Sequence, residues 1–174
     1  MNRWIVCLIG WVAWTTAAGQ SLHFDRYSKP QGLPTTGVYD VAQDVEGALW
    51  IATEDGGLSR FDGRTFRSYR RTEGLPDASV RSLYVANNGR LWLGLPESGL
   101  AYFENDSIHT LALPPGYPDL HVRCMLEDAA GRLVIGTKSD GLFVLNDTAL
   151  EPMQRPPGMD ATVRCALQDA DGHS

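Results

Sequence analysis

The sequence predicts an all-β protein made of repeated four-stranded antiparallel sheets, and three observations support this prediction. First, the sequence matches itself at an offset of about 42 residues, with copies that begin at Val38, Val80, Val122 and Val163. Second, each copy contains short runs rich in Val, Trp, Phe and Tyr that alternate at a period of two, as strands do. Third, glycine recurs about every ten residues, which disfavours helices. Helical solenoids of similar period are therefore excluded.

Each copy is predicted to contain four strands separated by turns. The first strand starts at the valine and ends at a turn glycine: Gly47, Gly89, Gly131 or Gly172. The second strand is an apolar run: A-L-W-I-A-T, R-L-W-L-G-L or R-L-V-I-G-T. A second turn glycine precedes the third strand: Gly57, Gly99 or Gly141. The fourth strand is the weakest: R-T-F-R-S-Y, S-I-H-T-L or T-A-L-E-P-M.

A period near 42 residues with four strands is typical of a β-propeller blade. The second strands support this because Leu49, Trp50 and Ile51 are consecutive apolar residues, as expected for a sheet covered on both faces. We interpret Trp50 and Trp92 as wedges between blades rather than as ligand-stacking platforms. We expect an incomplete ring of about 3.5 blades: a lead-in over 20–37, blades over 38–69, 80–111 and 122–153, and the first strand of a truncated fourth blade over 163–174.

The amino terminus predicts export. Arg3 precedes the apolar stretch 4–14 and a small-residue segment, which is the layout of a signal peptide over 1–19 with cleavage near Ala18 or Gly19. The stretch is short for a stable membrane span, although a retained anchor is the alternative. We expect an exported, periplasmic protein, and whether Cys124 and Cys165 then form a disulfide is left open.

The charge balance excludes one class of partner. The chain has 15 Lys and Arg against 21 Asp and Glu, a formal net charge of −6 and no basic run. Nucleic acid requires a positive surface, so no nucleic-acid partner is expected.

The repeat resembles a known family. Its pattern combines an Asp-x-x-Gly turn, an L-W-I-G-T-like strand and a G-G-L-like turn, preceded in two copies by Gly-Leu-Pro within 31–34 and 73–76. Together these features resemble the two-component regulator propeller repeat, over about residues 32–174. The resemblance implies an extracytoplasmic ligand-sensing region of a two-component receptor. In that family such blades precede a β-sandwich, a membrane helix and a cytoplasmic output domain, usually a histidine kinase and sometimes a diguanylate cyclase.

The chain also departs from this pattern. It stops inside the fourth copy, so we expect an amino-terminal fragment without a catalytic domain. The expected partners are the rest of the receptor, tethered to the inner membrane, and a second copy in a homodimer. The third copy has Val134 in place of the tryptophan and Pro114-Pro115-Gly116 in place of Gly-Leu-Pro, so its lead-in loop is expected to differ.

The candidate ligand site is the second residue of each copy: Tyr39, Arg81, Arg123 and Arg164. Equivalent residues of successive blades converge in a ring, and guanidinium groups suit carboxylate, phosphate and hydroxyl acceptors. We expect a small-molecule or oligosaccharide ligand here. The alternative is that each arginine pairs with a neighbouring carboxylate such as Asp119 or Glu127.

No metal or cofactor is expected. The Asp- and Asn-containing turns lack the remaining ligands of a calcium loop, and these residue types are the ones that hairpin turns require. The four histidines occupy different repeat positions and form no cluster. A protein-interaction propeller and part of a propeller lyase or hydrolase remain as alternatives, because other blades supply residues to such sites.

Overall fold

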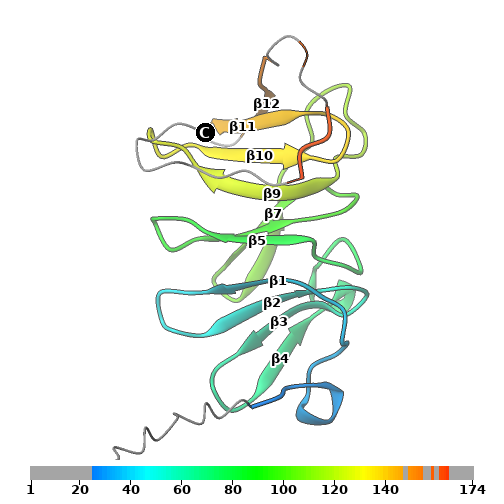
Figure 1. Ribbon diagram of the computed structural model, residues 1–174, viewed down its shortest axis with the longest axis vertical. Coiled ribbons are helices and arrows are strands. Elements are labelled where there is room, and N and C mark those ends of the chain that lie inside the picture. Colours follow the sequence, from blue (N-terminus) through cyan, green and yellow to red (C-terminus); the bar gives the residue numbers. More distant parts are fainter. Residues whose placement is uncertain (1–24, 147–148, 155–157, 159–160, 165–174) are drawn as a thin grey trace, which may run out of the picture.

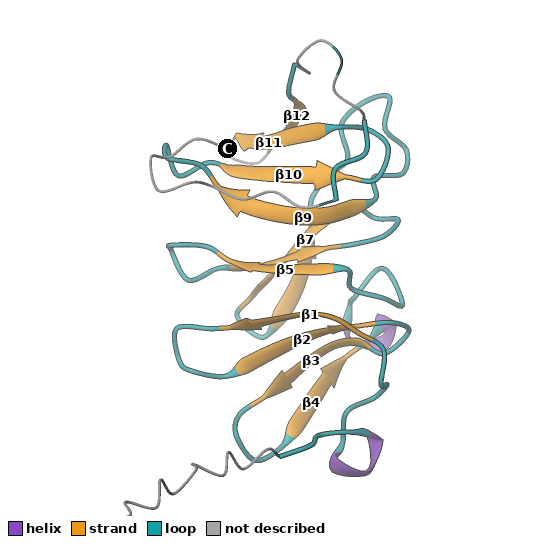
Figure 2. Cartoon of the chain, viewed as in Figure 1, coloured by secondary structure: helices purple, strands orange, loops and turns teal. Residues whose placement is uncertain are grey.

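The computed structural model describes residues 25–146, 149–154, 158 and 161–164, which form three four-stranded antiparallel sheets placed side by side (Figures 1 and 2). The first sheet contains β1 (Val38–Gln43), β2 (Leu49–Thr53), β3 (Gly57–Phe61) and β4 (Phe66–Tyr69). The second contains β5 (Ser82–Val85), β6 (Leu91–Gly94), β7 (Leu100–Glu104) and β8 (Ser107–Thr110). The third contains β9 (Val122–Glu127), β10 (Leu133–Thr137), β11 (Leu142–Asn146) and β12 (Ala149–Pro152). The predicted all-β propeller class is confirmed.

Each sheet is a meander in which every strand pairs with the next along the chain. The first strands lie next to one another across the sheets, because β1 contacts β5 and β5 contacts β9 (Figure 1). We call the sheets blades 1, 2 and 3 in chain order. In a propeller arrangement these first strands form the inner edge. The predicted signal peptide and most of the fourth copy lie outside the described residues.

The first hairpin turns are held by aspartate side chains. Asp44 Oδ1 accepts the backbone N–H groups of Glu46 and Ala48 at 3.0 and 2.9 Å. Asp128 Oδ1 does the same for Ala130 and Arg132, both at 2.9 Å. These carboxylates therefore have the turn-forming role that the sequence indicates.

One inner strand is shorter than the others for a local reason. In blades 1 and 3 the residue after the second strand donates its N–H to the residue before the first strand: Glu54 to the Gly37 carbonyl at 2.8 Å, and Lys138 to the His121 carbonyl at 2.9 Å. Blade 2 has Pro96 at this position, which carries no N–H. This missing bond accounts for the later start of β5, at Ser82.

The blades are joined by one backbone hydrogen bond that repeats at each junction. The N–H of Val80 donates to the carbonyl of Thr53 at 3.1 Å. Val122 donates to Leu95 at 3.0 Å, and Val163 donates to Thr137 at 2.9 Å. In the second, third and fourth copies the first valine is thus bonded to the end of the second strand of the preceding blade.

A small residue lies next to this valine in every blade: Ala52, Gly94 and Gly136. A Cβ atom added to Gly94 would lie 2.6 Å from Val122 Cγ1 and even closer to Ser82 Oγ. A Cβ on Gly136 would lie 2.6 Å from Val163 Cγ1. Such distances are far below van der Waals contact, so glycine lets the next blade approach.

The tryptophans lie in the junctions, as predicted. Trp50 is 3 % exposed, and its ring centroid is 4.6 Å from that of Phe103 in blade 2 and 5.8 Å from that of Tyr69 in its own blade. Trp92 is 6 % exposed and packs with Leu120 and Val122 at the next junction. Each junction is therefore a separate apolar core between two sheets.

The outer face of blade 1 lacks such a neighbour among the described residues. Val38 is 44 % exposed, whereas the equivalent Val80 and Val122 are 0 and 1 % exposed. Val41 and Leu49 are likewise exposed where their counterparts in blades 2 and 3 are buried. These positions are buried only when another blade precedes them.

The lead-in loops correct one sequence-based alignment. Gly32, Gly74, Gly116 and Gly158 all have a positive φ, between 87 and 107°. Gly116-Tyr117-Pro118 is thus the counterpart of Gly-Leu-Pro in the third copy, and Pro114-Pro115 precedes it. The loop differs as expected: blades 1 and 2 have the short 3₁₀ helices η1 (Lys29–Gln31) and η2 (Arg71–Glu73), whereas Tyr117 N–H bonds to the Pro114 carbonyl.

The described part of the chain contains no helix with the length and apolar content needed to cross a membrane.

Gly94→Ala is expected to destabilise the chain by roughly 1–3 kcal/mol, because the added methyl group overpacks the junction with Val122. Urea unfolding of the full chain measures the change. In a Val122→Ala background the same substitution should have a smaller effect, since the residues are in contact. A Gly94→Ala protein as stable as the parent would contradict this account of the junction.

Candidate functional site

A cavity of about 210 Å³ lies where the inner strands of the three blades begin. We call it the inner cavity. It receives residues from all three blades: Tyr39, Ser79, Arg81, Pro96, His121, Val122, Arg123 and Lys138. Three of the four residues that the sequence singles out are therefore brought together.

Most of the lining comes from three repeat positions. One is the residue before the first strand's valine, Ser79 or His121; another is the residue after that valine. The third follows the second strand, at Pro96 and Lys138. The backbone bond between Lys138 and His121 holds two of these positions together in blade 3. The cavity is thus built by the repeat itself, and its chemistry is set by which side chains occupy these positions.

Tyr39 and Arg81 form a contact between blades 1 and 2. The Arg81 guanidinium carbon lies 4.2 Å from the centroid of the Tyr39 ring, in a cation–π arrangement. The Tyr39 hydroxyl donates to Glu54 Oε1 at 2.9 Å. This hydrogen bond to the carboxylate raises the pKa of Tyr39 above its usual value, and Arg81 opposes the shift. Tyr39 therefore remains a neutral hydroxyl at physiological pH.

The cations of the inner cavity have no carboxylate partner among the described residues. The ion pairs in that part of the chain involve other arginines: Arg60, Arg67, Arg90 and Arg132. Glu127, a carboxylate that the alternative interpretation named, accepts hydrogen bonds from the Asn87 N–H at 3.0 Å and the Tyr84 hydroxyl at 3.4 Å. Arg81 and Arg123 thus line one cavity, and neither is in an ion pair with a described carboxylate.

Arg164 is exposed and does not line the cavity. Sequence reasoning missed Ser79, Pro96, His121 and Lys138, which do line it. His121, directly before β9, is half-buried. Only the place of these four residues in the repeat could have identified them, because the equivalent positions of the other copies hold different residue types.

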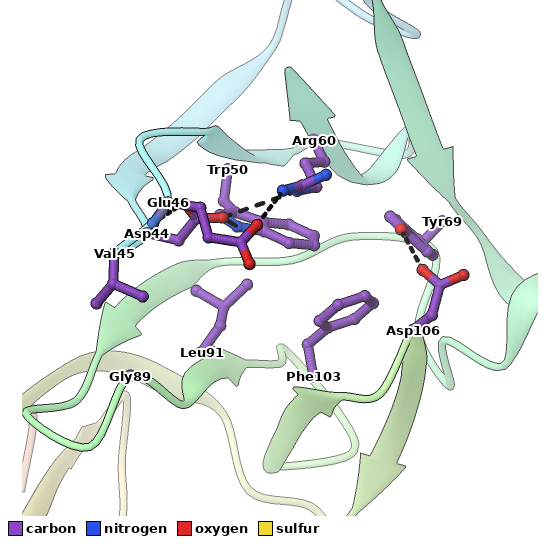
Figure 3. A pocket seen from close by; sticks show the side chains of 10 residues that line it. All are labelled: Asp44, Val45, Glu46, Trp50, Arg60, Tyr69, Gly89, Leu91, Phe103 and Asp106. Carbon is purple, nitrogen blue, oxygen red and sulfur yellow. Dashed lines mark hydrogen bonds and ion pairs between the residues drawn. The ribbon is translucent and has the colours of Figure 1, made fainter. Parts of the chain in front are cut away.

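A second cavity, of about 300 Å³, lies between blades 1 and 2 at the opposite end of the inner strands, near the first hairpin turns (Figure 3). We call it the junction cavity. Its lining combines buried apolar side chains with charged ones: Asp44, Val45, Glu46, Trp50, Arg60, Tyr69, Gly89, Leu91, Phe103 and Asp106.

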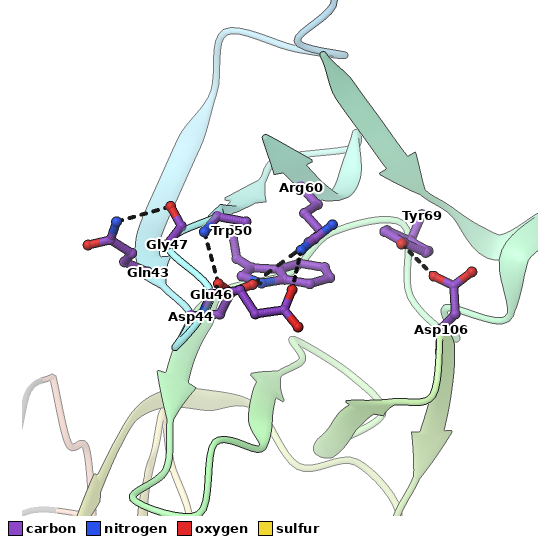
Figure 4. A network of polar contacts seen from close by, with 9 residues as sticks. Gln43, Asp44, Glu46, Gly47, Trp50, Arg60, Tyr69 and Asp106 are labelled. Carbon is purple, nitrogen blue, oxygen red and sulfur yellow. Dashed lines mark hydrogen bonds and ion pairs between the residues drawn. The ribbon is translucent and has the colours of Figure 1, made fainter. Parts of the chain in front are cut away.

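The charged groups of the junction cavity bind one another (Figure 4). Asp44 Oδ2 accepts the indole N–H of Trp50 at 2.8 Å. Arg60 Nη2 lies 2.9 Å from Glu46 Oε2, and Arg60 Nε lies 3.7 Å from Asp44 Oδ2. These contacts position Trp50 in the junction, which is a structural role.

Tyr69 and Asp106 connect the outer strands of the same two blades. The Tyr69 hydroxyl donates to Asp106 Oδ1 at 2.9 Å, and Arg67 Nη2 lies 2.7 Å from Asp106 Oδ2. Burial and the bond to Asp106 raise the pKa of Tyr69 to about 12. Arg67 and Tyr69 together lower the pKa of Asp106. Because these polar groups are already paired with one another, the junction cavity is part of the packing between blades 1 and 2.

Among the described residues, no group of three or more His, Cys, Asp or Glu side chains is arranged to hold a metal ion.

The fold is part of a β-propeller, and three of its blades contribute side chains, several of them cationic, to the inner cavity. The model of the two component regulator propeller family matches residues 32–55 and 74–96, which are the lead-in and second-strand regions of blades 1 and 2. The resemblance to the two-component regulator propeller repeat that the sequence predicts is therefore confirmed for these two segments.

Known proteins agree with this. Histidine kinase P4 of Formosa agariphila is 39 % identical over 51 residues, which are 29 % of this chain and 4 % of that protein. The extracellular domain of the hybrid two component system BT3049 from B. thetaiotaomicron superposes with a TM-score of 0.74 at 22 % identity, over 86 % of this chain and 22 % of that one.

Virginiamycin B lyase from Staphylococcus aureus also superposes, with a TM-score of 0.60 at 19 % identity, over 70 % of this chain and 42 % of the lyase. At these identities the structural likeness shows the fold alone. The chain spans only a small part of the histidine kinase and less than half of each solved structure.

Tyr69→Phe is expected to destabilise the chain by roughly 1 kcal/mol at neutral pH, because the bond to Asp106 is lost. The pKa of Tyr69 in the folded chain is raised to about 12 from its usual value of 10.0, so its protonated form stabilises the fold below pH 10 and this contribution is lost as the pH rises through about 12. The difference between parent and variant in the free energy of unfolding, measured in urea, should therefore shrink over that range.

Tyr27→Phe, at an exposed ring, is the control. A difference between the parent and Tyr69→Phe that stays constant with pH would refute this role of Tyr69.

Proposed function

We propose that this chain is the extracytoplasmic ligand-sensing region of a two-component signal-transduction receptor, and that the inner cavity binds the ligand. The observation that carries the proposal is the convergence of Tyr39, Arg81 and Arg123 on one cavity with no described carboxylate to neutralise the arginines. Binding residues commonly lie in loops that a rigid scaffold positions. The inner cavity lies at such loops, where β1, β5 and β9 begin.

The position of the cavity suggests how binding is transmitted. A ligand there contacts side chains from blades 1, 2 and 3 at once. The Arg81–Tyr39 contact joins blades 1 and 2 within this lining. A ligand that binds one arrangement of the blades more tightly than another shifts the population toward it, by its difference in affinity. Structures beyond the described residues would carry that shift to an output domain.

The output and the compartment are parts of the same proposal. The match to a histidine kinase supports a kinase output, with a diguanylate cyclase as the other output of the resembled family. The likeness to extracellular domains of two-component systems, together with the amino-terminal sequence, supports export.

A thermal-shift screen of the full chain against neutral and acidic sugars, amino acids and organic acids tests the proposal. A ligand at about 100 times its Kd stabilises the folded chain by about 2.7 kcal/mol and raises its Tm. Combining Arg81→Ala and Arg123→Ala should abolish that rise. Arg132→Ala, at an arginine outside the cavity that pairs with Asp128, should retain it.

Two results would count against the inner cavity as the ligand site. One is a ligand whose stabilising effect is the same in the parent and in the double variant. The other is a screen in which no compound raises the Tm of the parent.

A further inference from the structure

The charge of the three cavity-forming repeat positions changes from blade to blade. Blade 1 has Gly37, Tyr39 and Glu54; blade 2 has Ser79, Arg81 and Pro96; blade 3 has His121, Arg123 and Lys138. The carboxylate in blade 1 gives way to one cation in blade 2 and two in blade 3. The chain as a whole has a net charge of −6, so this local excess of cations is contrary to the overall balance.

The single carboxylate of this set is bound to a tyrosine and is not part of the lining. Glu54 accepts the Tyr39 hydroxyl at 2.9 Å and does not line the cavity. Arg81 is stacked on the Tyr39 ring rather than paired with Glu54. The lining of the cavity therefore combines two hydroxyl-bearing residues, Tyr39 and Ser79, with three cations, which are Arg81, Arg123 and Lys138.

We infer that the inner cavity takes a ligand that carries an anionic group on a hydroxyl-rich body, with the anion held by Arg123 and Lys138 of blade 3. This inference rests on the proposed function, because it names the ligand class of the same site. Lys138 is the residue that determines charge selectivity: it adds a second cation to blade 3, where blade 2 has an uncharged proline. A carboxylate and a phosphate share this chemistry, because each accepts charge-assisted hydrogen bonds from both side chains.

The cavity's polarity also predicts the orientation of the ligand. The Tyr39 hydroxyl donates to Glu54, and the Ser79 hydroxyl donates to Asp55 Oδ1 at 3.3 Å and accepts the Asp55 N–H at 3.0 Å. A sugar-like body would therefore donate its own hydroxyl groups to these two oxygens. Removing either hydroxyl should weaken acidic and neutral ligands to the same extent. Removing Lys138 should weaken only the acidic ones, and this asymmetry separates a selectivity residue from one that merely shapes the cavity.

NMR titration of the labelled full chain measures this with four probes: galacturonate, its methyl ester, galactose and inorganic phosphate. Galacturonate is expected to bind about tenfold more tightly than its methyl ester, since the ester retains the shape and lacks the charge. Lys138→Gln should reduce galacturonate affinity about tenfold and leave the ester unchanged. Arg132→Gln, which removes an arginine of blade 3 outside the cavity, should leave all affinities unchanged.

The outcomes separate this inference from the proposed function. Phosphate binding that is tighter than galacturonate binding and is lost in Lys138→Gln supports the inference and identifies phosphate as the source of the charge. Equal affinities for galacturonate and its ester, or no saturable binding of either anion, overturn the inference. In those cases a ligand from the thermal-shift screen that depends on Arg81 and Arg123 still supports the proposed function. An unchanged galacturonate affinity in Lys138→Gln overturns the assignment of Lys138.

Discussion

The arrangement of the sheets depends on one contact that recurs at each junction between copies. The valine at the start of the second, third and fourth copies donates its N–H to the end of the preceding second strand, and its side chain lies against a small residue. The bond sets the position of each blade along the second strand of the preceding blade. The small residue, which is Ala52, Gly94 or Gly136, sets the distance between the two sheets. Every aromatic contact in the junctions, including that between Trp50 and Phe103, requires this spacing.

The same contact places the candidate site. Arg81 and Arg123 directly follow the bonded valines Val80 and Val122, so the backbone that joins the blades also brings these two side chains to the cavity. Tyr39 follows Val38, the equivalent valine of blade 1. The scaffold and the site therefore tolerate change differently. Small residues and valines are constrained by packing, whereas the neighbouring positions vary in charge from one copy to the next without disturbing the junction. Ligand chemistry can diverge at these positions while the fold is retained.

Much of the fold could be predicted from the sequence because its determinants repeat. Turn glycines, alternating strands and a valine at the start occur in every copy, so the strand assignment in one copy supports the assignment in the others. The site was only partly accessible to the same reasoning: the second residue of each copy was found because it neighbours the conspicuous valine. Lys138 and His121 were missed because they follow or precede strands in columns where the copies differ. Gly116-Tyr117-Pro118 was misaligned because two prolines precede it and a tyrosine replaces the leucine.

The exposed face of blade 1 bears on how such a protein is made. Val38, Val41 and Leu49 are translated before any residue of blades 2 and 3, yet neither of those blades covers them. An apolar β-sheet face left open during synthesis and export is a binding surface for chaperones and a starting point for aggregation. The first blade to be synthesised therefore keeps this apolar face exposed even after blades 2 and 3 have folded.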